Sequence, residues 1–140
     1  MILLDTSGLL AAIDEDEHRH AAAAASLRHA APPRILSPFV LAEVDYLLAT
    51  RVGVAAQNAM LDEVAAGVFH LAPFDGDDVA AARSIMDRYR DLRLGLADAS
   101  VVVLATRHRT LDVLTLDERH FRALRGPGGR PFRVLPANAA

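Results

Sequence analysis

Short apolar runs alternate with longer helical patterns along the chain, and this alternation limits the possible fold more than any other feature. The sequence predicts strands at Ile2–Leu4, Arg34–Leu36, Val68–Leu71, Val113–Leu116 and Phe132–Leu135. It predicts helices over residues 6–13, 18–30, 38–51, 54–66, 77–91, 97–108 and 118–124. Strands separated by helices indicate a parallel sheet with helices on both faces. We therefore expect an α/β fold.

Length and composition limit the class of protein. The chain has 140 residues, the size of one domain, and is 52% hydrophobic and 24% charged, which is typical of a soluble globular protein. It contains no cysteine, so disulfides and thiolate metal sites are excluded. The longest strongly apolar stretch, residues 99–105, is too short to span a bilayer. No charged region precedes an apolar one, so no signal peptide is expected.

The net charge of −3 argues against nucleic-acid binding by charge alone. Bound divalent cations and local arginine clusters can reverse the local field, so a nucleic-acid partner stays open. All 15 basic residues are arginine, which excludes a catalytic lysine. Two groups of arginines form either solvated faces or contacts to RNA phosphates, the second of them close after Asp117. They are Arg88, Arg90 and Arg93, and Arg119, Arg122, Arg125, Arg130 and Arg133.

Four acids occupy positions where a solvated carboxylate is not expected. Asp5 and Asp117 each follow an apolar strand, and ligands of open parallel sheets bind outside the carboxyl ends of the strands. On the helix that starts after Ser37-Pro38, helical spacing predicts that Glu43 points inward and Asp45 toward solvent. The same spacing predicts an inward Asp98 among apolar neighbours.

A buried ionised carboxylate is very unfavourable unless it is paired or bound to a metal. Each acid taken singly could be a helix cap or half of an ion pair, and capping suits Asp98 and Asp117 well. Taken together, the four oxygen donors favour a Mg²⁺ or Mn²⁺ site. Without metal, at least one of these acids should have a raised pKa. A divalent ion there would activate water, orient a phosphate and stabilise a leaving oxygen.

Histidines offer fewer indications. His120 lies three residues after Asp117 on nearly the same helical face, so it could be a further metal ligand, a substrate contact, or a structural or surface residue. His18 and His20 lie in a polar stretch without further ligands at zinc spacing, and we interpret them as surface residues.

Five segments together resemble the PIN-domain ribonucleases, and most closely the VapC toxins of type II toxin–antitoxin modules. The segments are MILLDTSGLLA, SPFVLAEVDYLL, LGLADASVVVLA, VLTLDERHF and PFRVLP. Each is weakly specific by itself, but their order and spacing are informative. The resemblance covers residues 1–140 as a single PIN domain, and implies a three-layer α/β/α fold with a parallel sheet of four to five strands.

The resemblance also implies a site and an activity. Asp5, Glu43, Asp98 and Asp117 would form the catalytic quartet, with Asp5, Asp98 and Asp117 as metal ligands and Thr6 and Thr115 as supporting hydroxyls. Ser7 matches less well and could instead cap the first helix. The implied protein is a cytoplasmic, Mg²⁺- or Mn²⁺-dependent endoribonuclease that acts on RNA. It would form a homodimer without membrane association and be inhibited by a cognate VapB-type antitoxin.

Other acidic α/β proteins fit the sequence less well. A response-regulator receiver needs an acid pair after its first strand and a late lysine, and neither is present. A haloacid-dehalogenase-type phosphatase needs Asp-x-Asp where this chain has Asp5-Thr6-Ser7. No phosphate-binding P-loop is present. The remaining alternative is a PIN fold that binds RNA or protein without nuclease activity.

Overall fold

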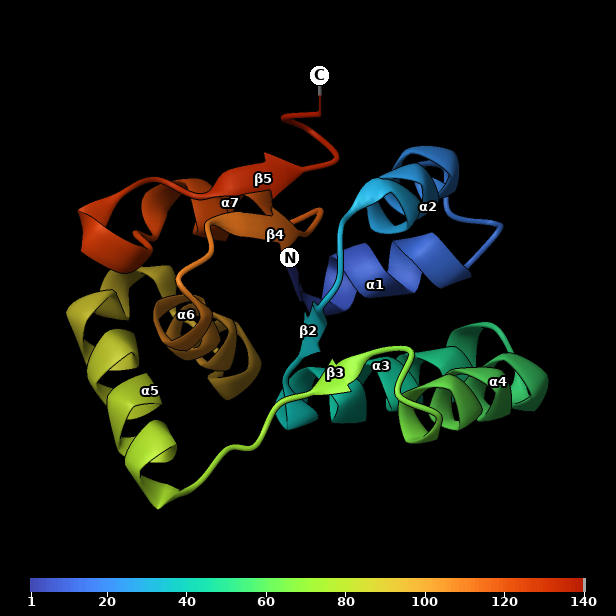
Figure 1. Ribbon diagram of the computed structural model, residues 1–140, viewed down its shortest axis with the longest axis horizontal. Helices are drawn as coiled ribbons and strands as arrows, with labels where there is room; N and C mark the ends of the chain where they lie inside the picture. Colours follow the sequence, from blue (N-terminus) through green and yellow to red (C-terminus); the bar gives the residue numbers. More distant parts are fainter. Residues whose placement is uncertain (140) are drawn as a thin grey trace.

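The computed structural model describes residues 1–139, which contain one parallel sheet of five short strands (Figure 1). The strands are β1 (Ile2–Leu4), β2 (Arg34–Leu36), β3 (His70–Leu71), β4 (Asp112–Leu114) and β5 (Arg133–Leu135). Their order across the sheet is β3-β2-β1-β4-β5, with every neighbouring pair parallel. The prediction of a parallel sheet with four to five strands is confirmed.

Helices cover both faces of this sheet. They are α1 (Thr6–Ile13), α2 (His20–His29), α3 (Pro38–Arg51), α4 (Val54–Ala65), α5 (Gly76–Arg88), α6 (Leu96–His108) and α7 (Glu118–Ala123), with 3-10 turns η1 (Arg90–Leu92) and η2 (Pro127–Gly129). In Figure 1, α1 and α2 lie on one side of the sheet and α5 and α6 on the other, with α3 and α4 beside β2 and β3. Leu3, Leu4, Ile35, Val113 and Leu114 are almost completely buried in the central strands, which explains why the strands read as continuous apolar runs.

The order of the strands reverses direction at β1. From β1 the chain first moves outward through β2 and β3, then returns to add β4 and β5 on the other side. Such a reversal separates the connections that leave two neighbouring strands, here β1 and β4, and in open parallel sheets ligands bind outside the carboxyl ends of two such strands. Asp5 directly follows β1, and its backbone N–H donates to the carbonyl of Leu114 at the end of β4 (3.0 Å).

Several predicted elements differ from the structure at their ends; the helix expected at 18–30 is His20–His29, and the strand expected at 113–116 is Asp112–Leu114. The strand expected at residues 68–71 is reduced to His70 and Leu71, both exposed, because β3 is an edge strand with one partner only. The helix expected to reach residue 91 ends at Arg88 and continues as η1. Its start is fixed by a reciprocal capping box between Asp75 and Asp78.

None of the helices described in residues 1–139 has the length and apolarity needed to span a membrane.

Candidate active site

The first part of the site is a set of hydroxyls around Asp5. The Asp5 side chain is only 3% exposed, and its Oδ2 accepts from the hydroxyl of Thr115 (2.7 Å) and from that of Ser7 (3.2 Å). The two hydroxyl oxygens lie 3.2 Å apart. Because Thr115 immediately follows β4, the pairing of β1 with β4 is what brings these groups together.

Ser7 therefore does not cap α1, as one alternative held. Asp5 occupies the N-cap position of that helix without a side-chain capping bond. The Ser7 hydroxyl instead accepts the backbone N–H of Leu116 (2.9 Å) while it contacts Asp5. The sequence does not reveal this role of Ser7, because two of its partners, Thr115 and Leu116, lie more than a hundred residues away along the chain.

Glu43 approaches the same edge of the sheet from α3. The hydroxyl of Thr6, the first residue of α1, donates to Oε1 of Glu43 (2.8 Å). Thr6 directly follows Asp5, so this hydrogen bond holds the Glu43 carboxylate beside the start of α1. The hydroxyls predicted to support the acids, Thr6 and Thr115, each contact a different member of the quartet.

The orientation predicted for α3 was wrong. Its buried stripe consists of Val40, Val44 and Leu48, whereas Glu43 is exposed and Asp45 is partly buried. Apolar residues occur almost all round this helix, so its sequence did not define one inward face. The neighbouring helices determine the orientation of α3. This helix packs against both α1 and α4, and Asp45 accepts a hydrogen bond from Gln57 of α4 (2.8 Å).

Asp98 and Asp117 complete the set from two helix N-termini. Asp98 lies in the first turn of α6, whose N-cap is Gly95, so Asp98 is not the cap. Asp117 does cap α7: its Oδ1 accepts the backbone N–H of His120 (3.1 Å). The backbone N–H of Asp117 donates in turn to the Thr115 hydroxyl (2.9 Å), which connects this acid to Asp5 through a single hydroxyl group.

The charges of the four acids act on one another. Burial raises the pKa of Asp5 to about 6, and the nearby charge of Asp98 adds to this effect, while the Thr115 hydroxyl opposes it. Burial also raises the pKa of Asp98; the charge of His120 opposes the shift, and the charges of Asp117 and Glu43 add to it. The prediction that at least one acid has a raised pKa agrees with this arrangement.

The donor set fits a hard divalent cation. Oδ1 of Asp5 is buried and has no hydrogen-bond partner among residues 1–139, so this carboxylate has an oxygen available for an ion. The other donors are carboxylate oxygens, which suit Mg²⁺ and Mn²⁺. Within the described part of the chain, no three Asp, Glu or His side chains are already spaced as metal ligands. An ion would therefore have to draw these side chains together.

The PIN-domain family model matches residues 2–127 of this chain. The chain belongs to the PIN-domain family. It is 48% identical over 135 residues to Ribonuclease VapC26 of Mycobacterium tuberculosis, a match that covers 96% of this chain and all of that relative. This similarity places our PIN domain among the VapC proteins.

Two solved structures share the fold of this PIN domain. Mycobacterium tuberculosis VapC20, described as a sarcin–ricin loop cleaving toxin, has a TM-score of 0.77 at 22% identity, covering 84% of this chain and 90% of that one. FitAcB from Neisseria gonorrhoeae has a TM-score of 0.55 at 22% identity, covering 78% and 83%. At these identities the likeness concerns the fold alone.

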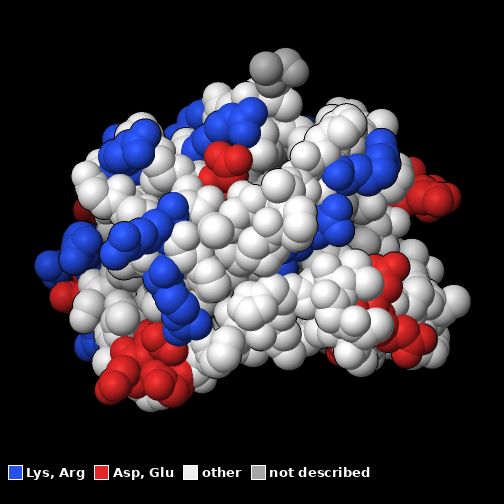
Figure 2. Space-filling model, viewed as in Figure 1, with Lys and Arg blue, Asp and Glu red and all other residues white. Residues whose placement is uncertain are grey.

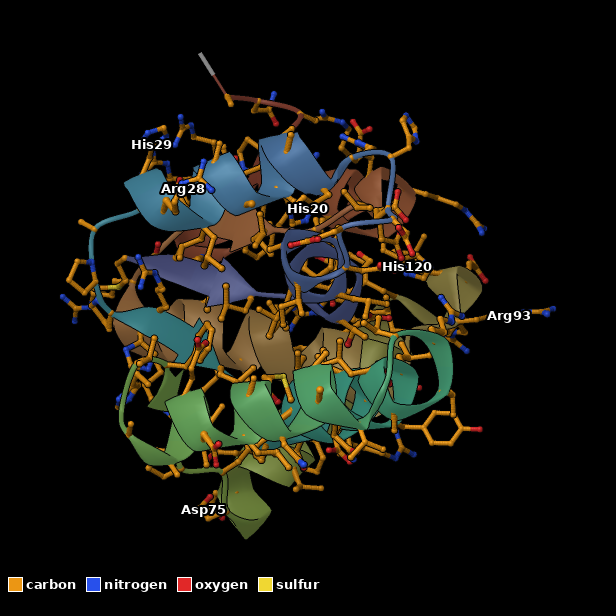
Figure 3. The ribbon with its side chains drawn as sticks, turned by 90° about the vertical axis from the view of Figure 1, so that its right-hand side faces the viewer. His20, Arg28, His29, Asp75, Arg93 and His120 are labelled. Atoms are coloured by element: carbon orange, nitrogen blue, oxygen red, sulfur yellow. The ribbon has the colours of Figure 1, made fainter. Side chains whose placement is uncertain are left out.

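The arginine groups of this PIN domain are not one surface. Arg122 pairs with Glu118 (2.8 Å) and Arg133 with Asp112 (3.2 Å). Arg133 begins β5 and so lies at the amino edge of the sheet, opposite the acids, which corrects the expectation that the second group flanks the site as a whole. Figure 2 shows arginines scattered between white and acidic areas on the face it presents. In Figure 3, Arg93 of the first group projects at the same end of the molecule as His120.

A buried pair of serines that the sequence analysis missed joins α3 to α6. The hydroxyls of Ser37 and Ser100 lie 2.6 Å apart, and both residues are at most 1% exposed. Ser100 donates to the carbonyl of Ala97 (2.6 Å), and Ser37 accepts from the N–H of Phe39 (3.2 Å). The hydrogen between the two hydroxyls therefore comes from Ser37. The sequence indicates only that Ser37 caps a helix, because its partner Ser100 lies 63 residues further along the chain.

We expect Ser100→Ala to lower the free energy of unfolding by about 1–3 kcal/mol, because it leaves the buried Ser37 hydroxyl without an acceptor. Urea unfolding measures the change. Ser84→Ala, at an exposed site on α5, should stay within about 0.5 kcal/mol. The double variant Ser37→Ala with Ser100→Ala should lose less stability than the sum of the losses in the two single variants. Strict additivity would show that the two hydroxyls are energetically independent.

Proposed function

We propose that this PIN domain is a Mg²⁺- or Mn²⁺-dependent endoribonuclease and the toxin of a VapBC-type pair. The observation that carries the proposal is the convergence of four carboxylates near the carboxyl ends of β1 and β4. Burial and the neighbouring acidic charges raise the pKa of Asp5 and of Asp98, and one buried oxygen of Asp5 has no partner among the described residues. The similarity to Ribonuclease VapC26 over nearly the whole chain supports the same activity.

Asp5, Asp98 and Asp117 are the residues we assign to the divalent ion. When bound, such an ion lowers the pKa of a coordinated water and stabilises charge on the phosphate and the leaving oxygen. Thr115 and Ser7 occupy Oδ2 of Asp5 with hydrogen bonds and so leave Oδ1 available. Thr115 also fixes the backbone of Asp117, so one hydroxyl aligns two of the proposed ligands.

Glu43 has a different proposed task. It is exposed, and the Thr6 hydroxyl restrains one of its oxygens. A carboxylate held in this way can accept a hydrogen bond, and then a proton, from an attacking water. We therefore assign Glu43 to orienting water rather than to direct metal binding.

The partners and the extent of the domain belong to the same proposal. We infer an RNA substrate, a cognate VapB-type antitoxin, a homodimer and a cytoplasmic location from the membership in the VapC proteins. We also infer that residues 1–140 form a single PIN domain. The family match ends at residue 127, but β5 (Arg133–Leu135) pairs with β4 in the same sheet, which argues for one folding unit.

The test is cleavage of total RNA by the purified protein with Mg²⁺ or Mn²⁺. We expect cleavage with either ion, none with excess chelator, and a loss of about 10²–10³-fold in Asp98→Asn, the size of effect seen when a key electrostatic group is removed. Asp87→Asn, an exposed acid on α5, is the matched control and should cleave normally.

Cleavage that persists in Asp98→Asn or in chelator would contradict the proposal. A protein that neither cleaves RNA nor gains stability from Mg²⁺ or Mn²⁺ would instead be a binding module with the same fold. Mapping the cut ends of the RNA would then define the target sequence and structure.

A further inference from the structure

The imidazole of His120 lies between two of the proposed metal ligands. Its Nδ1 is 2.9 Å from Oδ2 of Asp117 and 3.6 Å from Oδ2 of Asp98. This nitrogen is buried, and within residues 1–139 no acceptor is aligned for a hydrogen bond with it, in spite of the short distance to Asp117. In Figure 3, His120 lies at the opposite end of the molecule from His29.

The cap of α7 puts the imidazole there. Oδ1 of Asp117 accepts the backbone N–H of His120, which fixes the two residues relative to each other. Side chains on a helix tilt toward its N-terminus, so the imidazole of His120 is directed back to the free Oδ2 of Asp117. The two oxygens of Asp117 are therefore used separately, one for the backbone and one facing Nδ1.

A structural histidine in this fold looks different. Nδ1 of His20 lies 2.8 Å from the backbone carbonyl of Ala11 and forms a hydrogen bond with it. His120 has no such carbonyl partner among the described residues, and its Nδ1 faces two carboxylates instead. From the sequence alone, His120 could be a metal ligand, a substrate contact, or a structural or surface residue.

The distances from Nδ1 of His120 to Asp117 and Asp98 are close to those between neighbouring ligand atoms of one metal ion. In an octahedral site with bonds of about 2.1 Å, adjacent ligand atoms lie about 3 Å apart. The distance from Nδ1 to Asp117 already has this value, and the one to Asp98 exceeds it by about 0.6 Å. Asp98 is partly exposed and can close that difference by rotating its side chain. This also explains why the three groups do not form a finished metal site as they stand.

We propose that His120 binds the divalent ion directly through Nδ1, together with Asp98 and Asp117. The inference rests on the proposed metal-dependent function and adds a nitrogen ligand to the carboxylates. Imidazole nitrogen is a donor typical of transition-metal ions, whereas the preferred donors of Mg²⁺ are oxygens. The site should therefore bind Mn²⁺ more tightly than a site made of carboxylates alone.

The test uses Mn²⁺ itself as the spectroscopic probe. Electron spin echo envelope modulation of the protein with one equivalent of Mn²⁺ should show a directly coordinated ¹⁴N nucleus. Labelling only the histidines with ¹⁵N should replace that signal, which shows the nitrogen to be from histidine without any substitution. The signal should be absent in His120→Gln and unchanged in His29→Gln, the control at the far end of the molecule.

Calorimetric titration with each ion gives an independent result. His120→Gln should lose about tenfold or more in Mn²⁺ affinity, within the range for changes around metal ligands, and clearly less in Mg²⁺ affinity. A histidine that only supports the fold would lower both affinities alike. Circular dichroism of the variant establishes that it is folded, and the ¹⁵N experiment on the unaltered protein needs no variant.

The outcomes separate the inference from the proposed function. If Mn²⁺ binds and Asp98→Asn abolishes binding, but no histidine nitrogen is coupled to the ion, His120 is not a ligand and the carboxylate site stands. If Mn²⁺ does not bind, or binds equally well in Asp98→Asn, the proposed metal site itself is wrong.

Discussion

Asp5→Asn is expected to change activity and stability in opposite directions. RNA cleavage should fall about 10²–10³-fold, because the variant removes a proposed metal ligand. The metal-free variant should nevertheless unfold at higher urea concentration than the metal-free parent at pH 7. The charge of Asp5 is buried, and burial holds its pKa at about 6, so the ionised form is unfavourable in the folded state. Asparagine has no charge and keeps an acceptor for Thr115.

The pH dependence gives the sign and the size of this effect. The pKa of Asp5 is raised from 3.8 to about 6 in the folded state, so the folded protein keeps the proton over this interval after the unfolded chain has lost it. The metal-free parent should thus lose stability relative to Asp5→Asn as the pH rises from about 4 to about 6, by at most about 3 kcal/mol. Below pH 4 the difference should be constant.

Urea unfolding of both proteins in chelator across this pH range measures the difference. Adding Mn²⁺ at pH 7 should stabilise the parent and leave Asp5→Asn unchanged, since the parent alone can use the ion to neutralise the buried charge. A variant that is less stable than the parent at every pH would show that the buried charge of Asp5 does not destabilise the metal-free protein.

Gly8→Ala is expected to destabilise the protein by about 3 kcal/mol or more, at the upper end for overpacked sites. A Cβ on Gly8 would overlap the carbonyl group of Leu114 and lie 2.7 Å from the backbone nitrogen of Thr115. Both are backbone atoms of the central sheet, so no side-chain rotation relieves the contact. The same close approach of α1 to β4 holds Ser7 next to Thr115 (3.2 Å), so metal binding should weaken as well.

The sign of this prediction is diagnostic. In an ordinary helix, glycine to alanine stabilises by up to about 1 kcal/mol. Gly76→Ala, in the first turn of α5 with nothing within 4 Å of its added Cβ, is the matched control and should be neutral or stabilising. Thermal and urea unfolding of the two variants measures both changes. A Gly8→Ala protein as stable as the parent would mean that α1 can move away from the sheet.

The sequence by itself determined the layout of this protein. Apolar runs such as Ile2–Leu4 and Val113–Leu116, separated by helical patterns, specified a parallel sheet, because strands buried on both faces have no polar alternation. Acids placed directly after two of those runs, Asp5 and Asp117, pointed to the carboxyl edge of the sheet. These signals are local, because hydrophobic periodicity and the ends of strands are properties of short segments of the sequence.

Only the tertiary structure decided which groups meet. It turned Glu43 toward solvent and Asp45 toward α4, joined Ser37 to Ser100, and gave Ser7 a role in holding Asp5. It also brought Nδ1 of His120 between Asp98 and Asp117. Apart from the local contacts of His120 with Asp117 and of Ser7 with Asp5, these contacts depend on how far one helix lies from another segment, and side-chain spacing along a single helix carries no information about that distance.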